Sequence, residues 1–453
     1  MNLHRLLRER EAANDPVRVG ILGCGKFASM FLAQAIRTPG VHVAAIADLD
    51  PAAARANLAR IGWPAERHGA ADLAAALRSG GTWITDDVEA AFRQEPIDLV
   101  IDSTGDPPSG IRHVLLACET GKSIVMVNVE ADALAGPLLA RKAREAGIVY
   151  SLAYGDQPAL ICDLVDWART CGFEVTAAGR GHKWLPEYRF YTPDNVWDGY
   201  GLTPEQAALG GLNPKMFTSF LDGSKPAIES TAVANATGLA AAPDGLAYPP
   251  AGIDALPYVC RPKSEGGALH RKGQVEVVSS LGRDGTPLDY DIRFGVFVAF
   301  EADSDYVARC FEEYGVRTDD SGRYAAMYKR WHLIGLELGV SVASVALRGE
   351  PTGAPTGWRA DAVAVAKRDL RAGETLDGEG GYTVSGRLMP AARSLAEGAL
   401  PMGLTHGVRL ANPVAKDGLV RWSDVAADSG DPAVRLRREM EDLYRPALLE
   451  AAE

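Results

Sequence analysis

Residues 17–36, "VRVGILGCGKFASMFLAQAI", constrain the fold more than any other stretch of the chain. An apolar strand leads into a turn at Gly23 to Gly25, and apolar residues then recur at intervals of three and four, which predicts a helix. Gly23 permits the tight turn, Gly25 lets the backbone approach a pyrophosphate, and the small Ala28 allows close packing of helix on strand. The segment therefore predicts the start of a dinucleotide-binding domain.

The residues that follow extend this pattern. A second buried strand, "VHVAAIAD", ends in Asp48, at the position where a carboxylate binds adenosine ribose hydroxyls. Asp48 would repel a 2′-phosphate, which favours NAD over NADP, although either cofactor is open. Strand and helix patterns then alternate, which predicts a parallel, doubly wound α/β sheet of the Rossmann type. The alternative is that the glycines serve only the turn.

Further cofactor contacts are expected where other strands end, because ligands of such sheets bind at the carboxyl ends of the strands. The stretch "DSTGDP" follows one strand, and "VNVEADALAG", residues 127–136, follows another. A plain turn or a polar loop is the alternative for both. The predicted cofactor-binding residues are Gly23, Gly25, Lys26, Phe27, Asp48, Ser103, Thr104, Gly105 and Asn128. In the second stretch Glu130 is expected to face substrate or metal, and Asp132 suits a helix cap or a first-turn charge.

Charge and composition exclude several classes of protein. The net charge is −12, with 47 Lys and Arg against 59 Asp and Glu, which argues against a nucleic-acid binder. The first 15 residues are charged and lack the apolar core of a signal peptide, and no apolar run has the length of a membrane helix. The six cysteines show no metal-site spacing. We therefore expect a cytoplasmic protein with reduced thiols, no membrane or nucleic-acid partner and a small-molecule substrate.

The middle of the chain carries two groups of candidate catalytic residues. Asp156 lies at a strand-to-helix junction, where it either caps the helix or acts as a catalytic group or metal ligand. The stretch "GRGHKW" places Arg180, His182 and Lys183 within four positions, where they could bind an anionic substrate group or donate a proton. Lys183 is the preferred donor and His182 the second choice, since the two face opposite sides of an extended chain. A solvated strand end is the alternative.

A second charged group occurs in "LDGSKPAIE", which contains Asp222, Lys225 and Glu229. Lys225 and Glu229 are four residues apart, so on one helix they could pair as ions, or present an acid and a base or metal ligand to one substrate. Farther along, residues 328–342 have the pattern of a buried helix.

Several motifs together resemble a known group of proteins. "VNVEADALAG", "YGDQPALICDLVDWA", "GRGHKW", "DGSKPAIE", "WHLIGLELGVSV" and "AVAKRDLRAGETLDG" are similar to reductoisomerase-like proteins, related to 1-deoxy-D-xylulose 5-phosphate reductoisomerases and homoserine dehydrogenases, that end in a SAF domain. The chain departs from these enzymes at Val129, where they have a lysine. The resemblance covers nearly the whole chain.

The resemblance implies an enzyme of three domains. These are a Rossmann domain at 1–153, an α+β catalytic domain at 154–350 and a small β-rich SAF-like domain at 351–453. It implies an NAD(P)-dependent oxidoreductase, expected to form a homo-oligomer, that acts on a small polyhydroxy or keto substrate, phosphorylated or not. The implied catalytic residues are Glu130, Asp156, Lys183, Lys225 and Asp222, and the implied substrate-binding residues are Arg180, His182 and Lys183.

Two chemistries and one non-catalytic role stay open. In the first, Mg²⁺ or Mn²⁺ held by Asp156 and Glu229 assists a rearrangement of the carbon skeleton before hydride transfer. In the second, a lysine moves the hydroxyl proton and no rearrangement occurs, as in homoserine dehydrogenases. The third is a dinucleotide sensor without catalysis, which the loss of lysine at Val129 suggests.

Overall fold

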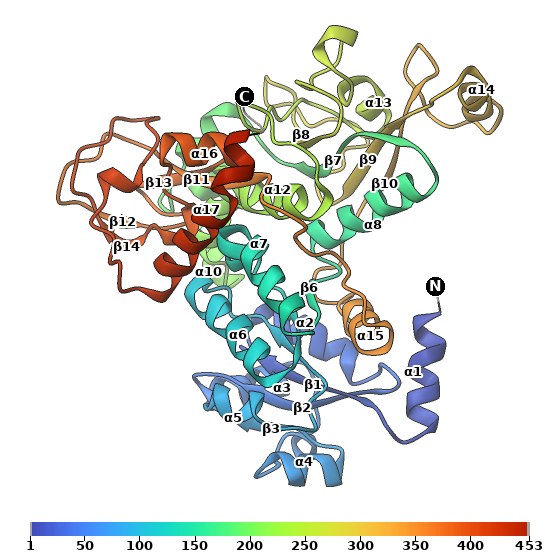
Figure 1. Ribbon diagram of the computed structural model, residues 1–453, viewed down its shortest axis with the longest axis vertical. Helices are drawn as coiled ribbons and strands as arrows, with labels where there is room; N and C mark the ends of the chain where they lie inside the picture. Colours follow the sequence, from blue (N-terminus) through green and yellow to red (C-terminus); the bar gives the residue numbers. More distant parts are fainter. Residues whose placement is uncertain (1, 451–453) are drawn as a thin grey trace. The chain divides into compact units, whose positions relative to one another are not determined.

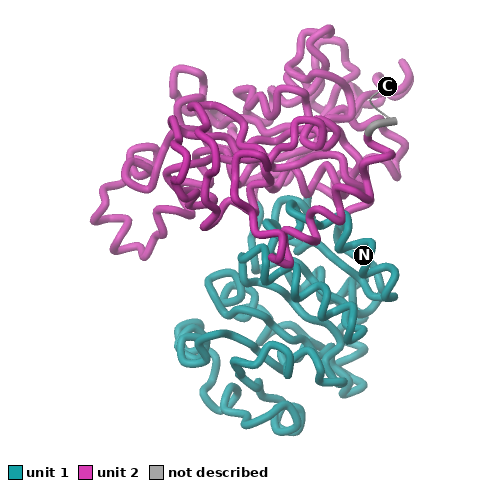
Figure 2. Tube along the Cα trace, turned by 60° about the vertical axis from the view of Figure 1, so that its left-hand side comes forward, with its two compact units in different colours: residues 1–160, 332–354 teal, residues 161–331, 355–453 magenta. Residues whose placement is uncertain are grey.

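The computed structural model describes residues 2–450, which divide into two compact units. Unit 1 comprises residues 1–160 and 332–354, and unit 2 comprises residues 161–331 and 355–453 (Figure 2). The chain therefore leaves unit 1 and later returns to it. The three predicted domain boundaries are not tested by this division and stay a prediction.

Unit 1 is built on a six-stranded sheet in which every neighbouring pair is parallel. The strand order is β3-β2-β1-β4-β5-β6, the order of doubly wound dinucleotide-binding sheets, so the predicted fold class is confirmed. The strands are β1 (Val17–Leu22), β2 (Val41–Ala47), β3 (Trp83–Thr85), β4 (Leu99–Asp102), β5 (Ser123–Met126) and β6 (Tyr150–Leu152).

Helices connect these strands and cover the sheet (Figure 1). They are α2 (Lys26–Ala35), α3 (Pro51–Arg60), α4 (Leu73–Ser79), α5 (Val88–Phe92), α6 (Pro107–Thr120) and α7 (Val129–Glu145). Two further helices, α1 (Leu3–Ala12) and α15 (Gly339–Arg348), pack on one another. Val342 and Val345 of α15 join Leu3 and Leu7 of α1 in the core that also contains the buried side of β1. The returning segment is therefore part of the core of unit 1.

Residues 328–342 do not form the predicted continuous helix. Tyr328 and Lys329 are the last two residues of a strand, an irregular segment follows, and the helix α15 begins only at Gly339. Gly335, at φ +75°, explains the interruption, because a side chain there would approach Met30 and Phe27 of α2. The apolar spacing was typical of a helix, but contacts with α2 impose a left-handed turn.

Unit 2 contains a mixed four-stranded sheet in the order β10-β9-β7-β8. Its strands are β7 (Glu174–His182), β8 (Gln274–Ser279), β9 (Val296–Glu301) and β10 (Tyr324–Lys329), and helix α8 (Gln157–Thr170) leads into β7. Shorter helices follow the strands or lie between them, namely α9 (Val196–Tyr200), α10 (Pro204–Leu209), α11 (Pro214–Leu221), α13 (Leu256–Val259) and α14 (Asp305–Glu313). The long helix α12 (Ser224–Thr237) packs on β8 and is buried along most of its length.

The other side of α12 faces the C-terminal part of the chain, which consists of short strands and two helices. The elements are β11 (Ala360–Ala366), β12 (Thr375–Asp377), β13 (Val384–Pro390), β14 (His406–Arg409), α16 (Ala391–Glu397) and α17 (Pro432–Glu450). Helix α12 contacts β11 and β13. Gly386 of β13 comes so close to α12 that a side chain there would collide with Ser224, whose hydroxyl accepts a hydrogen bond from the Gly386 N–H. Close backbone contact therefore joins the two parts of unit 2.

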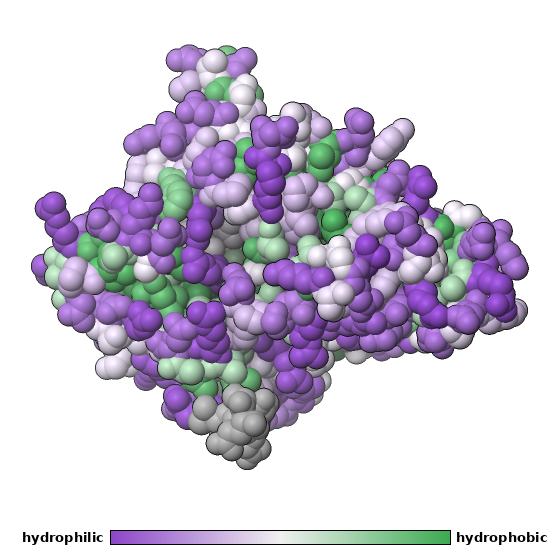
Figure 3. Space-filling model, turned by 90° about the horizontal axis from the view of Figure 1, so that it is seen from above, coloured by the Kyte–Doolittle hydropathy of each residue, from purple (hydrophilic) through white to green (hydrophobic). Residues whose placement is uncertain are grey.

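The face in Figure 3 is mostly hydrophilic, with apolar side chains in separate groups among polar ones. Within residues 2–450, no helix combines the length and the apolar character that crossing a membrane requires.

Candidate active site

The turn after β1 has the geometry expected of a pyrophosphate site. Gly23 is in the left-handed region at φ +81°, and a side chain there would press against the Ser103 backbone. Gly25 precedes α2, and a Cβ at this position would meet nothing within 4 Å. No side chain caps α2, so its first N–H groups are open to an anion. The predicted residues Lys26 and Phe27 form the first turn of this helix, and Lys26 is exposed. These residues fit a dinucleotide.

Asp48 lies directly after β2 and is half-buried. Its two oxygens accept hydrogen bonds from the backbone N–H groups of Cys24, at 2.6 Å, and Asp50, at 2.8 Å. The carboxylate therefore ties the glycine turn to the end of β2. Because a carboxylate can accept about four hydrogen bonds, ribose hydroxyls can still bind to it. Its predicted cofactor role stays a prediction.

The loops that follow β4 and β5 are tied to one another. The Thr104 hydroxyl donates to Asp102, at 2.7 Å, and the Ser103 hydroxyl donates to the Gly23 carbonyl, also at 2.7 Å. Asn128 caps α7 by accepting from the Ala131 N–H, and its amide donates to the carbonyl of Asp106 at 2.8 Å. These bonds fix the polar loops at the carboxyl edge of the sheet, where Gly105 takes φ +70°.

The two carboxylates near Asn128 lie in different environments. Glu130 is half-buried in the first turn of α7. Asp132 is fully buried and accepts a hydrogen bond from the Tyr150 hydroxyl at 2.7 Å, and burial raises its pKa to about 7. The cap of this helix is Asn128, so Asp132 occupies the predicted first turn but does not serve as the cap. Val129 is buried as well.

At the start of α8, Asp156 is buried, with one carboxylate oxygen accepting from the Gln157 N–H at 2.9 Å. Gly155, at φ +95°, leaves room for Glu337, since a Cβ would approach that side chain to 2.9 Å. Asp156 belongs to unit 1, whereas Glu229 belongs to unit 2. Among the described residues, no three His, Cys, Asp or Glu side chains are grouped as a metal site.

Unit 2 brings several of the predicted residues together between β7 and α12. Arg180 forms a buried ion pair with Glu229, a partner from another element that the helical spacing of Lys225 and Glu229 did not indicate. Lys225 is half-buried near the start of α12. β7 therefore delivers a guanidinium to the Glu229 carboxylate, and the predicted roles of Lys225 stay predictions.

His182 and Lys183 both bind main-chain carbonyls. The buried His182 ring lies 2.6 Å from the Phe220 carbonyl, and burial and Arg180 hold its pKa well below the ordinary value, so the neutral ring donates this bond. Lys183 is half-buried and donates to the Gly199 carbonyl at 2.6 Å. Burial, followed by the charge of Arg293, lowers the pKa of Lys183, which makes it the more suitable proton donor at neutral pH.

Asp222 meets a residue that the sequence did not indicate. Lys367 lies 2.7 Å from the Asp222 carboxylate, and both side chains are almost completely buried. The ammonium donates to the carbonyls of Tyr191 and Gly381, each at 2.7 Å. Lys367 occurs in "AVAKRDLRAGETLDG", one of the motifs that carry the resemblance, and it is not among the predicted site residues. The long separation in sequence hid the pair.

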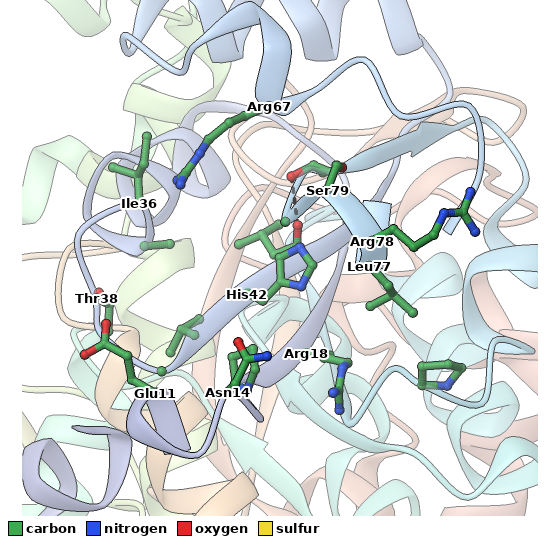
Figure 4. Close-up of a pocket in the computed structure, with 18 of the residues that line it drawn as sticks. Glu11, Asn14, Arg18, Ile36, Thr38, His42, Arg67, Leu77, Arg78 and Ser79 are labelled. Atoms are coloured by element: carbon green, nitrogen blue, oxygen red, sulfur yellow. Dashed lines mark hydrogen bonds between the residues drawn. The ribbon is translucent and has the colours of Figure 1, made fainter. Parts of the chain in front are cut away.

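A separate hollow of about 790 Å³ lies at the opposite edge of the sheet in unit 1 (Figure 4). Arg18 and His42, the second residues of β1 and β2, line it with Arg67 and Arg78. Figure 4 shows Arg67 and Arg78 extending in different directions. Arg78 lies in the last turn of α4, where a cation offsets the negative end of the helix dipole. We therefore assign no cofactor contact to this edge.

Two family models match the chain. Residues 155–338 match the catalytic domain of Oxidoreductase DRL, and residues 361–426 match the SAF domain. The chain therefore carries an oxidoreductase-type catalytic domain followed by a SAF domain, and the SAF prediction is confirmed. The narrower resemblance to reductoisomerases and homoserine dehydrogenases is not decided by these matches. No curated protein matches the chain.

Solved structures give a weaker likeness. A myo-inositol dehydrogenase from Lactobacillus casei is 17% identical, with 40% of this chain and 50% of that chain covered and a TM-score of 0.30. A 3-ketoreductase from Actinomadura kijaniata is 19% identical, with coverages of 38% and 50% and a TM-score of 0.25. An NAD binding oxidoreductase from Klebsiella pneumoniae is 16% identical, with coverages of 39% and 47% and a TM-score of 0.28. The chain thus spans at most half of each of these proteins. Likenesses of this extent give no evidence about the substrate of this chain.

Proposed function

We propose that the protein is an NAD(P)-dependent oxidoreductase that acts on a small polyhydroxy or keto substrate. The observation that carries the proposal is the pairing of two features in one chain. Unit 1 offers an uncapped helix after a glycine turn at the carboxyl edge of a Rossmann-type sheet. Unit 2 offers the half-buried amine of Lys183 in a domain that matches an oxidoreductase catalytic domain.

The residues divide the work of a carbonyl reduction. The nicotinamide supplies hydride to the substrate carbon when it is bound. In the proposal, Lys183 gives a proton to the oxygen as the carbonyl becomes a hydroxyl, so that hydride and proton together balance the reaction. Neutral His182 donates a hydrogen bond to Phe220 and thereby positions the end of β7. In the reverse direction Lys183 accepts the hydroxyl proton.

Rearrangement before hydride transfer is a second version of this proposal. It is favoured by the motif resemblance, which places acidic residues in both units. For Glu229 to hold a metal, its carboxylate would have to exchange Arg180 for the ion, which adds a cost to that version. The version without rearrangement needs no such exchange.

The test measures oxidation of NADH and NADPH with a panel of small ketoses, keto acids and their phosphates, with and without Mg²⁺ or Mn²⁺. Substitution Lys183→Met is expected to lower kcat at least a hundredfold without changing NADH affinity. Lys225→Met is measured beside Lys183→Met, because the sequence analysis proposes both lysines as proton donors. For Lys183, the rate of reduction should fall as pH rises through its lowered pKa, since the ammonium loses its proton.

The outcomes separate the candidates. Turnover that requires the metal supports rearrangement, and turnover without it supports simple hydride transfer. Tight cofactor binding without turnover of any substrate in the panel would favour the dinucleotide sensor over the enzyme. Full activity of Lys183→Met would assign the proton to another residue.

A further inference from the structure

A pocket of about 300 Å³ lies inside unit 2, between the part that matches the catalytic domain and the SAF part. Trp184, Arg189, Asp222 and Tyr248 line it from one side, and β13 lines it from the other with Arg387. We call it the SAF-side pocket. Its size is at the lower end for pockets that bind small molecules.

The pocket has two positive charges beside a single nearby negative charge. Arg189 and Arg387 share the Asp417 carboxylate, at 3.2 Å and 3.8 Å. Each guanidinium side chain is about one-third exposed, at 34% and 36%. Burial, followed by repulsion from Arg189, lowers the pKa of Arg387, so the two cations are held close together against their mutual repulsion. A bound oxyanion would supply the missing negative charge, and guanidinium groups bind phosphate and carboxylate with two parallel hydrogen bonds.

The acidic groups around the pocket do not remove this excess of positive charge. Asp222 is buried against Lys367 and is therefore neutralised by a third cation. Asp244 lies in the exposed rim, where water screens it. The two arginines keep Asp417 as their only ion-pair partner among the described residues.

Tyr248 adds a hydrogen-bond donor held in an unfavourable backbone conformation. Its φ is +49°, in the left-handed region that bulky residues avoid, and its ring stacks on Trp184 with centroids 4.2 Å apart. Gly223, at φ +88°, leaves room for the hydroxyl, since a Cβ there would come within 3.2 Å of it. Burial raises the pKa of Tyr248, so the hydroxyl keeps its proton, and it has no hydrogen-bond partner among residues 2–450. Disfavoured backbone at such a position is typical of ligand sites.

We propose that the SAF-side pocket binds the oxyanion end of a small polyol ligand, with Arg189 and Arg387 pairing with a phosphate or carboxylate and Tyr248 donating to a ligand oxygen. The SAF part then contributes a binding residue, Arg387. Oxyanion binding stands on the geometry of unit 2 alone. The identification of this ligand as the substrate rests on the proposed function.

The test uses the full chain and three probes with the same carbon skeleton: glycerol 3-phosphate, glycerate and glycerol. Isothermal titration and the thermal unfolding midpoint are measured at constant ionic strength in a buffer without phosphate. We expect saturable binding of glycerol 3-phosphate or glycerate, and none of glycerol. The anion that binds more tightly identifies the source of the oxyanion.

Two variants and a matched control then locate the site. Arg387→Gln is expected to weaken binding of the anionic probe at least tenfold. Tyr248→Phe, which keeps the stack on Trp184, should weaken it a few-fold. Arg368→Gln is the control, because Arg368 is also an arginine of the SAF part but is exposed and paired with Glu374. Unaltered affinity in Arg387→Gln, or stabilisation that never saturates and is equal in all variants, would overturn the inference, because both indicate a general salt effect.

Activity separates this inference from the proposed function. If the ligand is the substrate, Arg387→Gln raises KM while NADH affinity stays unchanged. If Arg387→Gln weakens anion binding but does not change KM, the pocket is an anion site, and the ligand is not the substrate. Absence of anion binding together with normal turnover would overturn the inference and leave the proposed function intact.

Discussion

The buried carboxylates of the candidate sites in the two units have different partners. In unit 1, Asp132 and Asp102 accept hydrogen bonds from neutral groups, the hydroxyls of Tyr150 and Thr104. In unit 2, Glu229 and Asp222 lie against cations, Arg180 and Lys367. The cofactor edge of unit 1 is thus built from backbone N–H groups and hydroxyls, which suit a large ligand held along its length. The site in unit 2 is built from full charges, which suit a small polar substrate.

The largest expected effect is a loss of stability when the Arg180–Glu229 ion pair of unit 2 is removed. Glu229→Gln removes the negative charge that Glu229 places beside the buried Arg180, and the loss of one partner of a buried pair costs about 3–5 kcal/mol. We expect the free energy of unfolding of unit 2 to fall by this amount in urea titrations. Glu89→Gln is the control, because the Arg93–Glu89 pair is exposed. An equal effect of both substitutions would contradict the distinction between the units.

The buried acid of unit 1 should show a pH dependence. Burial raises the pKa of Asp132 to about 7, so the folded state binds a proton more tightly than the unfolded state. Stability from this group is therefore present at low pH and is lost as pH rises between about 4 and 7, by about 4 kcal/mol. Asp132→Asn should remove this loss, and the exposed Glu119→Gln should not. Parallel pH profiles of the wild type and Asp132→Asn would contradict the raised pKa.

The cofactor edge can be tested without disturbing the fold. Gly25→Ala adds a methyl group into open space, so the unfolding midpoint should not change. The same methyl group would lie where the pyrophosphate approaches the backbone, and NADH affinity should fall at least tenfold, about 1.4 kcal/mol. Gly339→Ala also adds a methyl group into open space in unit 1 and should leave affinity unchanged. Unchanged affinity in Gly25→Ala would move the cofactor away from this turn.

The smallest expected effect concerns the choice of cofactor. Asp48→Asn removes the charge that repels a 2′-phosphate and keeps one oxygen, which can accept from the N–H group of either Cys24 or Asp50. The affinity for NADPH relative to NADH should rise about three- to tenfold, on the order of 1 kcal/mol, in fluorescence titrations. A ratio that does not change would show that Asp48 serves the turn alone.

The sequence predicted features whose signal is local. The glycine turn, the alternation of strands and helices that predicts a Rossmann-type sheet, and the SAF motif each depend on residues that are close in the chain, and the structure or a family match confirms them. Features that depend on long-range contacts were missed. Lys367 lies far from Asp222 in sequence, and Tyr248 is placed by its left-handed backbone, which no pattern around it indicates.

The return of the chain to unit 1 affects the order in which the protein can fold during synthesis. Helix α15 supplies Val342 and Val345 to the core of unit 1, and a ribosome makes this helix only after residues 161–331. Part of the apolar surface of the Rossmann-type sheet therefore stays exposed during synthesis until residues 161–331 have been made. Chaperones would have their main binding opportunity on this chain during that interval.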